Sequence, residues 1–266
     1  MSGAVAGGGE APLLPLLETS LAIELPLAID AERAARWAAG VREAREAWVS
    51  DFGGAQFSLG RAWYTHLEQG RSADYFEKAS ASDAVVEHAC PGLQAAMRDL
   101  VARVVGAGGG AGGGGGGGGA QVVARAGWCG PGVHVFPAGG LVATRGGEIH
   151  FDTEGLTPAH IAARAPALTL VVMLTPAAAG GGLRVWDAMY DGEDSRAYDA
   201  AEGADDDEDD DESSERMHLT CKYQAGTLVA IDSYRLHQIQ SFAGDVDRIS
   251  ATCHAALVQG VWETWF

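Results

Sequence analysis

Apolar positions recur along this chain with two different periods, one before and one after a long run of glycines. Asp30 precedes a stretch rich in Ala, Arg and Glu, which predicts a helix over residues 31–49 with Asp30 as its N-cap. Pro91 predicts the start of a second helix that ends near residue 105. Residues 52–89 carry several aromatic side chains but no single period, so their structure stays open. The buried stripe of the second helix is expected at Leu93, Met97, Leu100, Val101 and Val104.

Beyond the glycines, short apolar segments are separated by Gly and Pro, and about eight of them read as strands. Leu168–Leu174 is apolar on both faces and predicts a central strand, whereas Met217–Tyr223 alternates as an outer strand would. Many short strands with few helices between them predict a jelly roll or sandwich, preceded by N-terminal helices. The other predicted strands are Val133–Phe136, Leu141–Thr144, Leu183–Trp186, Thr227–Ile231, Leu236–Phe242 and Ile249–Leu257.

These patterns divide the chain into an irregular lead-in (1–29), a helical part that packs on the core (30–106), a flexible glycine loop (107–120) and a β domain (121–266). The glycine run either separates two parts or enlarges a surface loop, and we favour the surface loop. Within the β domain, residues 191–216 contain 14 Asp or Glu and 2 Arg, and form an acidic insertion between strands.

The charge of the chain limits the classes of partner that it can bind. The chain has a formal net charge of −18, and no basic cluster offsets it. We therefore expect no binding to nucleic acid or to an anionic membrane. The lead-in lacks the basic residues of a secretory signal, and no apolar run is long enough to span a bilayer, which predicts a soluble intracellular protein in the cytoplasm or an organelle. Four cysteines at scattered positions are expected as buried thiols: Cys90, Cys129, Cys221 and Cys253.

A candidate metal site begins at His150-Phe151-Asp152. Two residues spaced i, i+2 on an extended chain point the same way, so both side chains can reach one ion. Two histidines and a carboxylate on one face are the usual ligands of non-haem Fe(II). A second pair, His66 and Glu68, would diverge on a helix, and we interpret His66 as structural. His134 and His254 fall in strand patterns and are expected as hydrogen-bonded core or rim residues.

Further residues downstream complete the pattern. His237 follows a predicted strand, Arg248 comes eleven residues later, and Ser250 lies two beyond Arg248. Arg248 and Ser250 would share one face of a strand, where a guanidinium beside a hydroxyl suits a carboxylate. An anion site is therefore expected one strand from a metal ligand.

With these residues in place, the chain resembles the Fe(II)/2-oxoglutarate-dependent dioxygenase superfamily, and its prolyl-hydroxylase-like branch in particular. The shared pattern is His-x-Asp, a distal His and an Arg-x-Ser about ten residues on. The apolar strand at 170–174 followed by Gly180-Gly181-Gly182 also matches, and the resemblance covers residues 122–266.

The resemblance implies a mainly β fold with N-terminal helices, built on a double-stranded β-helix of cupin type. It implies that His150, Asp152 and His237 bind Fe(II), and that Arg248 with Ser250 holds the C5 carboxylate of 2-oxoglutarate. The expected reaction hydroxylates or otherwise oxidises a small molecule or a protein side chain with O2, releasing succinate and CO2, with ascorbate as a possible reductant. Asp152 favours oxidation over halogenation, because halogenating relatives lack this carboxylate.

One position departs from the family pattern. A tyrosine that touches 2-oxoglutarate usually precedes the His-x-Asp, but Thr144-Arg145-Gly146-Gly147 stands there, so the contacts to the C1 end stay unassigned. Two other functions remain open: a metal cupin that needs no 2-oxoglutarate, such as an isomerase or a sensor, and an interaction scaffold whose working part is the acidic insertion. Substrate identity and oligomeric state are not readable from the sequence.

Overall fold

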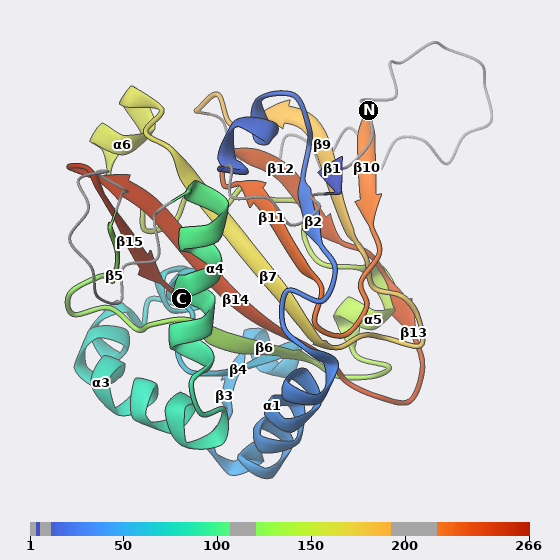
Figure 1. The fold of residues 1–266 in the computed structure, drawn as a ribbon. Coiled ribbons are helices and arrows are strands. Elements are labelled where there is room, and N and C mark those ends of the chain that lie inside the picture. Colours follow the sequence, from blue (N-terminus) through green and yellow to red (C-terminus); the bar gives the residue numbers. More distant parts are fainter. Residues whose placement is uncertain (1–3, 6–11, 107–120, 193–216) are drawn as a thin grey trace.

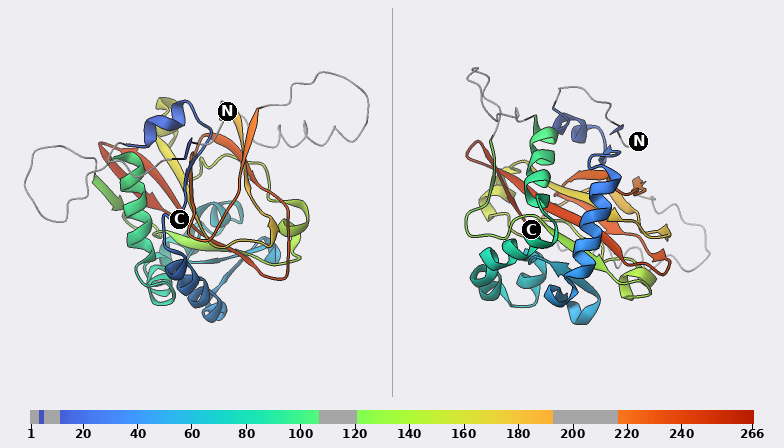
Figure 2. Two further views of the ribbon diagram at one scale, coloured as in Figure 1. Left: turned by 45° about the vertical axis from the view of Figure 1, so that its right-hand side comes forward. Right: turned by 60° about the horizontal axis from the view of Figure 1, so that its bottom comes forward.

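A computed structural model of the chain describes residues 4–5, 12–106, 121–192 and 217–266. The glycine run and most of the acidic insertion lie outside the described residues. The major sheet has the strand order β1-β2-β11-β7-β14-β6-β4-β3, and β15 pairs with both β14 and β5. A smaller sheet, β10-β9-β12, faces it, and β13 pairs with β8 (Figures 1 and 2). The fold is a mainly β double-stranded β-helix with N-terminal helices, which confirms the predicted fold class.

The strands span these residues: β1 Ala4–Val5, β2 Ile23–Leu25, β3 Val49–Asp51, β4 Gln56–Leu59, β5 Gln121–Ala124, β6 Gly132–Phe136, β7 Ala167–Thr175, β8 Ala179–Gly180, β9 Leu183–Met189, β10 His218–Cys221, β11 Leu228–Asp232, β12 Arg235–Ile239, β13 Phe242–Ala243, β14 Arg248–Val258 and β15 Val261–Trp265. The α-helices are α1 Ala31–Glu43, α2 Trp63–Glu68, α3 Ser72–Ala89, α4 Leu93–Val105, α5 Leu141–Arg145 and α6 Pro158–Ala163. None of the helices in the described part of the chain is long and apolar enough to cross a membrane.

Helices α1 and α4 cover the outer face of the major sheet (Figure 1). The carboxylate of Asp30 caps α1 by accepting from the Arg33 amide at 2.8 Å, as predicted. The predicted apolar stripe of α4 is buried at every position. These side chains pack on Leu170 and Val172 of β7, whose other face turns Thr169 toward the interior of the barrel. The central strand is therefore apolar on its outer face because helices cover it, and its inner face is free for a site.

Strand β14 separates its side chains in the same way. Ile249, Ala251, Cys253 and Ala255 belong to the core under the helices. Arg248 and Ser250 alternate with them and line the interior cavity. The ladder with β6 fixes this register, pairing Arg248 with Phe136 and Ser250 with His134. The prediction that Arg248 and Ser250 share one face is confirmed.

Two sequence expectations were wrong. Leu141–Thr144, predicted as a strand, forms the short helix α5, whose buried Val142 and Ala143 pack on Phe136 and Phe242. A four-residue apolar run has no period that separates strand from helix, so packing decides. The first helix ends at Glu43, six residues before the predicted end. The chain after it extends to pair β3 with β4, which overrides the helical propensity of the sequence.

The N-terminal half contributes more strand than its sequence suggested. The lead-in contains β2, which pairs with β11 of the major sheet. Residues 52–89, whose structure the sequence left open, contain β4, α2 and the 18-residue helix α3. Because β4 pairs with β6, this segment extends the major sheet and brings α2 to the open end of the barrel.

Candidate metal centre and anion site

The segment that carries His150 and Asp152 runs along strand β12. The His150 amide donates to the His237 carbonyl, and the His237 amide returns a bond to the His150 carbonyl, each at 3.0 Å. The Asp152 amide donates to the Ser233 carbonyl at 2.9 Å. This backbone pairing sets the three side chains side by side, and their candidate ligand atoms all lie within 4.8 Å of one another.

Both histidines present the same ring nitrogen to the centre. Nδ1 of His150 bonds the Glu148 carbonyl at 2.8 Å, and Nδ1 of His237 bonds the Arg235 carbonyl at 2.9 Å. A carbonyl can only accept, so Nδ1 carries the proton in each neutral ring, and Nε2 then has a lone pair for a metal ion. The two Nε2 atoms lie 3.5 Å from Oδ1 and 3.2 Å from Oδ2 of Asp152, respectively. This is the donor set and tautomer that a divalent metal ion requires.

A buried hydroxyl fixes the carboxylate. Thr169 Oγ1 donates to Asp152 Oδ2 at 2.6 Å and lies 3.0 Å from Ser233 Oγ and 3.2 Å from His254 Nδ1. The His254 ring stacks on Trp265 at a centroid distance of 5.9 Å. These contacts agree with the prediction that His254 is a hydrogen-bonded core histidine.

The electrostatics favour a cation at this point. Burial opposes the charge of Asp152, but His237, His254 and His150 together hold the pKa of its carboxyl well below the ordinary value. Burial and the neighbouring His237 lower the pKa of His150 to about 4. Burial also acts against the charged form of His237, but the Asp152 carboxylate prevails and raises its pKa. The ionised Asp152 carboxylate, which favours a proton on His237, would equally favour a metal cation at this point.

The predicted anion residues lie on β14 in the same cavity. Arg248 is almost fully buried, yet no carboxylate of the described residues forms an ion pair with it. Its Nε donates to the Gly181 carbonyl at 3.1 Å, and Nη1 lies 3.4 Å from Ser250 Oγ. Gly181 has φ +69°, a backbone conformation that favours glycine and aims this carbonyl at the guanidinium. Burial of an arginine without a counter-charge is costly, and a bound carboxylate would supply it.

Tyr223 is a residue that sequence reasoning missed. Its ring centroid lies 5.3 Å from Cζ of Arg248, and its hydroxyl is buried without a hydrogen-bond partner in the described structure. Tyr223 lines the cavity with Arg248 and Ser250. A buried hydroxyl is normally satisfied, so the orphaned one fits a ligand oxygen at this end. The only sequence signal is its place at the end of a predicted outer strand, which singles out no function.

The wall at the other end comes from the N-terminal half. Phe52, Gln56, Tyr64 and Glu68 line it, on β4, α2 and the turn before β4. Phe52 has φ +48°, unusual for a bulky residue, and its ring lies 6.3 Å from that of Tyr64. Burial raises the pKa of Glu154, which also lines this end, to about 7, and the nearby charges of Asp152 and Glu68 add to the shift.

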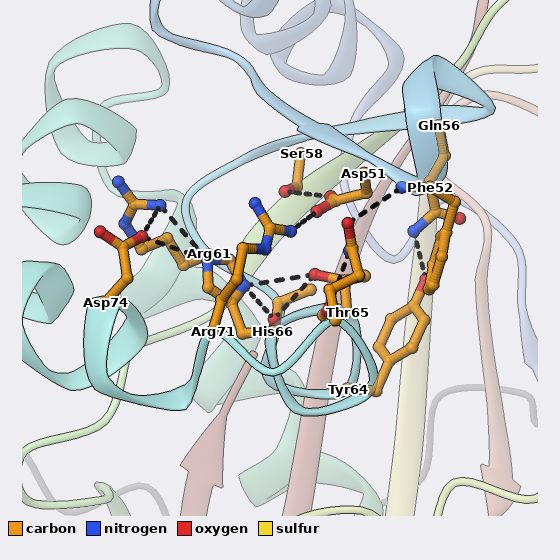
Figure 3. A network of polar contacts seen from close by, with 12 residues as sticks. Asp51, Phe52, Gln56, Ser58, Arg61, Tyr64, Thr65, His66, Arg71 and Asp74 are labelled. Carbon is orange, nitrogen blue, oxygen red and sulfur yellow. Dashed lines mark hydrogen bonds and ion pairs between the residues drawn. The ribbon is translucent and has the colours of Figure 1, made fainter.

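A polar network holds this wall in place (Figure 3). Fully buried Asp51 accepts from Arg71 at 2.7 Å and from Ser58 at 2.9 Å, which ties β3 and β4 to the turn before α3. His66 Nδ1 bonds the Ala62 carbonyl at 2.8 Å, and Arg61 Nη1 lies 3.3 Å from its Nε2. His66 therefore anchors α2 from within, which agrees with the structural role predicted for it. The contacts leave the other face of α2 to the cavity.

His134 lies on β6 between the two ends. Its ring is 5.8 Å from Tyr64 and 4.7 Å from Phe266. His134 is buried, as predicted. Its Nδ1, however, has no hydrogen-bond partner among the described residues. Burial, with the charges of His254 and Arg248, lowers its pKa to about 3, so the ring is neutral.

The structure therefore brings all five sequence-predicted residues, His150, Asp152, His237, Arg248 and Ser250, to one cavity. Fold and site together define a two-histidine, one-carboxylate centre inside a double-stranded β-helix.

No family model matches the chain, and no curated protein matches it in sequence. Among solved structures, the chain is similar to an N-substituted L-amino acid dioxygenase from Burkholderia ambifaria AMMD, with a TM-score of 0.53 and 14% identity over 94% of this chain and 87% of that chain. A structure of such a dioxygenase from the same organism in complex with alpha-KG gives a TM-score of 0.53 and 15% identity over the same shares. At these identities the likeness shows a shared fold.

Proposed function

We propose that this chain is an Fe(II)- and 2-oxoglutarate-dependent oxygenase that oxidises a small-molecule substrate. One observation carries the proposal: a two-histidine, one-carboxylate cluster lines the same cavity as a buried arginine that has no carboxylate partner among the described residues. The fold shared with a dioxygenase whose structure contains alpha-KG supports it. A cupin-type isomerase or sensor would need the metal ligands but not the arginine.

The residues present fit both groups. His150, Asp152 and His237 would hold the iron through two Nε2 atoms and a carboxylate oxygen, leaving other positions open. Arg248, Ser250 and Tyr223 offer one guanidinium and two hydroxyls to the far carboxylate of 2-oxoglutarate. When bound, iron and 2-oxoglutarate would supply the activation of O2, with 2-oxoglutarate converted to succinate and CO2.

The protein's own contribution is position and charge. The Nδ1 bonds to backbone carbonyls keep both imidazoles in the ligating tautomer, and Thr169 holds the Asp152 carboxylate. Arg248 balances the far carboxylate inside a cavity lined by Leu183 and Ile239. Such a desolvated pocket strengthens these charge interactions and keeps water from the reacting groups.

The test is succinate formation from 2-oxoglutarate by the purified protein with Fe(II) and ascorbate, without added substrate. We expect slow turnover that is lost in His150→Ala and strongly reduced in Arg248→Ala. Because Arg248 is buried, Arg248→Lys is included, and thermal unfolding is followed for every variant. Lysine keeps the charge but not the planar fork, so weakened 2-oxoglutarate binding in a folded variant is expected.

A folded wild-type protein that neither turns over nor binds 2-oxoglutarate in the presence of metal would overturn the proposal. The metal cupin would then take its place. Normal turnover in His150→Ala would instead point to a scaffold that does not depend on the cluster.

A further inference from the structure

The charges that line the cavity are unequally divided between its two ends. Among the described lining residues, Arg248 is the sole Lys or Arg, whereas four carboxylates are present: Glu68, Glu148, Asp152 and Glu154. With Fe(II) and 2-oxoglutarate bound, the charge of the metal balances that of the co-substrate, and the charge of Arg248 balances that of Asp152. The three glutamates then set the charge of the space that remains for a substrate, and a cavity of one sign attracts a ligand of the other.

Two of these glutamates act on each other at the end formed by the N-terminal half. Glu154 is half-buried, and the charges of Asp152 and Glu68 both act on it. The charge of Glu68 also acts on Tyr64 of α2, which lines the same end. The carboxylates of Glu154 and Glu68 lie close enough to repel each other, and a cation between them would relieve the repulsion.

The other groups at this end also suit a cation with an apolar body. Tyr64 and Phe52 bring two aromatic rings, whose faces attract a positively charged nitrogen. Phe52 lines the cavity although 39% of its surface is exposed. Apolar side chains exposed at a cavity wall mark a contact surface for a ligand. They offer a place for the apolar part of the molecule.

His134 supplies an independent sign of a polar ligand. It is 6% exposed and lines the cavity beside Tyr64, and its Nδ1 has no hydrogen-bond partner among the described residues. A neutral imidazole nitrogen can accept from an N–H group without repelling its charge. A buried nitrogen left unsatisfied is rare unless a ligand completes it.

We propose that the substrate carries a cationic nitrogen on an apolar body, with Glu154 and Glu68 binding the cation and Phe52 and Tyr64 contacting the body. This inference rests on the proposed function, because it takes iron and 2-oxoglutarate to occupy the other end of the cavity. It adds the chemical class of the substrate to that function.

The experiment is calorimetric titration of the protein loaded with Fe(II) and 2-oxoglutarate under nitrogen. The probes are phenethylamine and butylamine, each compared with the alcohol and the carboxylate of matching shape. We expect each amine to bind about tenfold or more tightly than its alcohol, and the carboxylates to bind most weakly. Glu154→Gln and Glu68→Gln should each reduce this preference. Glu77→Gln, an exposed carboxylate on α3 outside the cavity wall, should keep it.

Equal binding of alcohols and amines, no detectable binding of any probe, or a preference that survives in both cavity variants would overturn the inference. The proposed function fails separately, by the absence of succinate formation. Turnover without amine preference removes the inference alone. Amine preference without turnover supports the cation site and removes the proposed oxygenase.

Discussion

The hydroxyl of Thr169 on β7 donates to Oδ2 of Asp152 over 2.6 Å, in a buried position between Ser233 and His254. The carboxylate therefore cannot rotate freely about its last bond. The strand that forms the centre of the sheet thus also orients the carboxylate of the candidate metal centre.

Replacing Thr169 by Val keeps the shape of the side chain and removes this hydrogen bond. We expect Thr169→Val to lower the affinity for Fe(II) about 10–100-fold, because partners of metal-ligating carboxylates commonly have effects of this size. Titration of the metal-free protein with Fe(II) under nitrogen measures it. Thr220→Val, at an exposed position of the outer strand β10, is the matched control. An unchanged affinity in a folded variant would rule out the orienting role.

The Tyr223 hydroxyl should bind 2-oxoglutarate. Tyr223→Phe keeps the ring beside Arg248 and removes only the orphaned oxygen, so 2-oxoglutarate affinity should fall about tenfold, as expected for a hydrogen bond to a charged group. Tyr234→Phe is the control, because that hydroxyl is also at a partly buried position but donates to the His160 carbonyl. Direct titration with 2-oxoglutarate in the presence of metal separates binding from turnover. Equal dissociation constants for wild type and Tyr223→Phe would contradict this assignment.

The network in Figure 3 should contribute to stability. Arg71→Met leaves the fully buried Asp51 carboxylate with Ser58 but without its ion pair, and we expect a loss of about 1–3 kcal/mol in the free energy of unfolding. Urea unfolding measures the loss. Arg36→Met breaks an exposed pair on α1 and should cost less than about 0.5 kcal/mol. If both variants lose the same free energy of unfolding, the buried ion pair stabilises the protein no more than the exposed one does.

The cysteines should be unreactive in the folded protein. All four are free and buried, as predicted from their spacing, and burial raises the pKa of Cys90, Cys129 and Cys253 to about 12. A raised pKa keeps a thiol protonated, and only the thiolate reacts quickly. An aromatic disulfide reagent at about pH 8 should label almost no thiol before unfolding and four afterwards. Rapid labelling of the native protein would contradict the buried assignment.

The sequence was most informative where a local rule acts alone. The i, i+2 spacing placed Arg248 and Ser250 on one face of β14, and Asp30 capped α1 where its position predicted. Helix α3 escaped notice because its buried face consists of few residues, chiefly Tyr75, Ala79 and Val86. The N-terminal wall escaped as well, because it depends on β4 pairing with β6 more than seventy residues later. No local pattern encodes such a long-range contact.

The roles of Tyr223 and Thr169 could not be predicted for a related reason. Each is an ordinary residue type in an ordinary strand context, and each gains its meaning from a partner brought near by the fold: Arg248 for Tyr223 and Asp152 for Thr169. The His-x-Asp, the distal His and the Arg-x-Ser stand out in the sequence because they occur together in this order. A single hydroxyl does not stand out.

The register of β14 has a geometric consequence. The ladder with β6 fixes Arg248, whose neighbour Ile249 also pairs with β7, and the backbone bridge to His150 fixes His237. The backbone pairing therefore holds the guanidinium and the metal ligands at a fixed separation. Under the proposed function, we expect a 2-oxo diacid one methylene shorter or longer than 2-oxoglutarate to bind more weakly, because it would fit only one of the two groups well. The β-sheet ladders would then select the co-substrate by the length of its carbon chain.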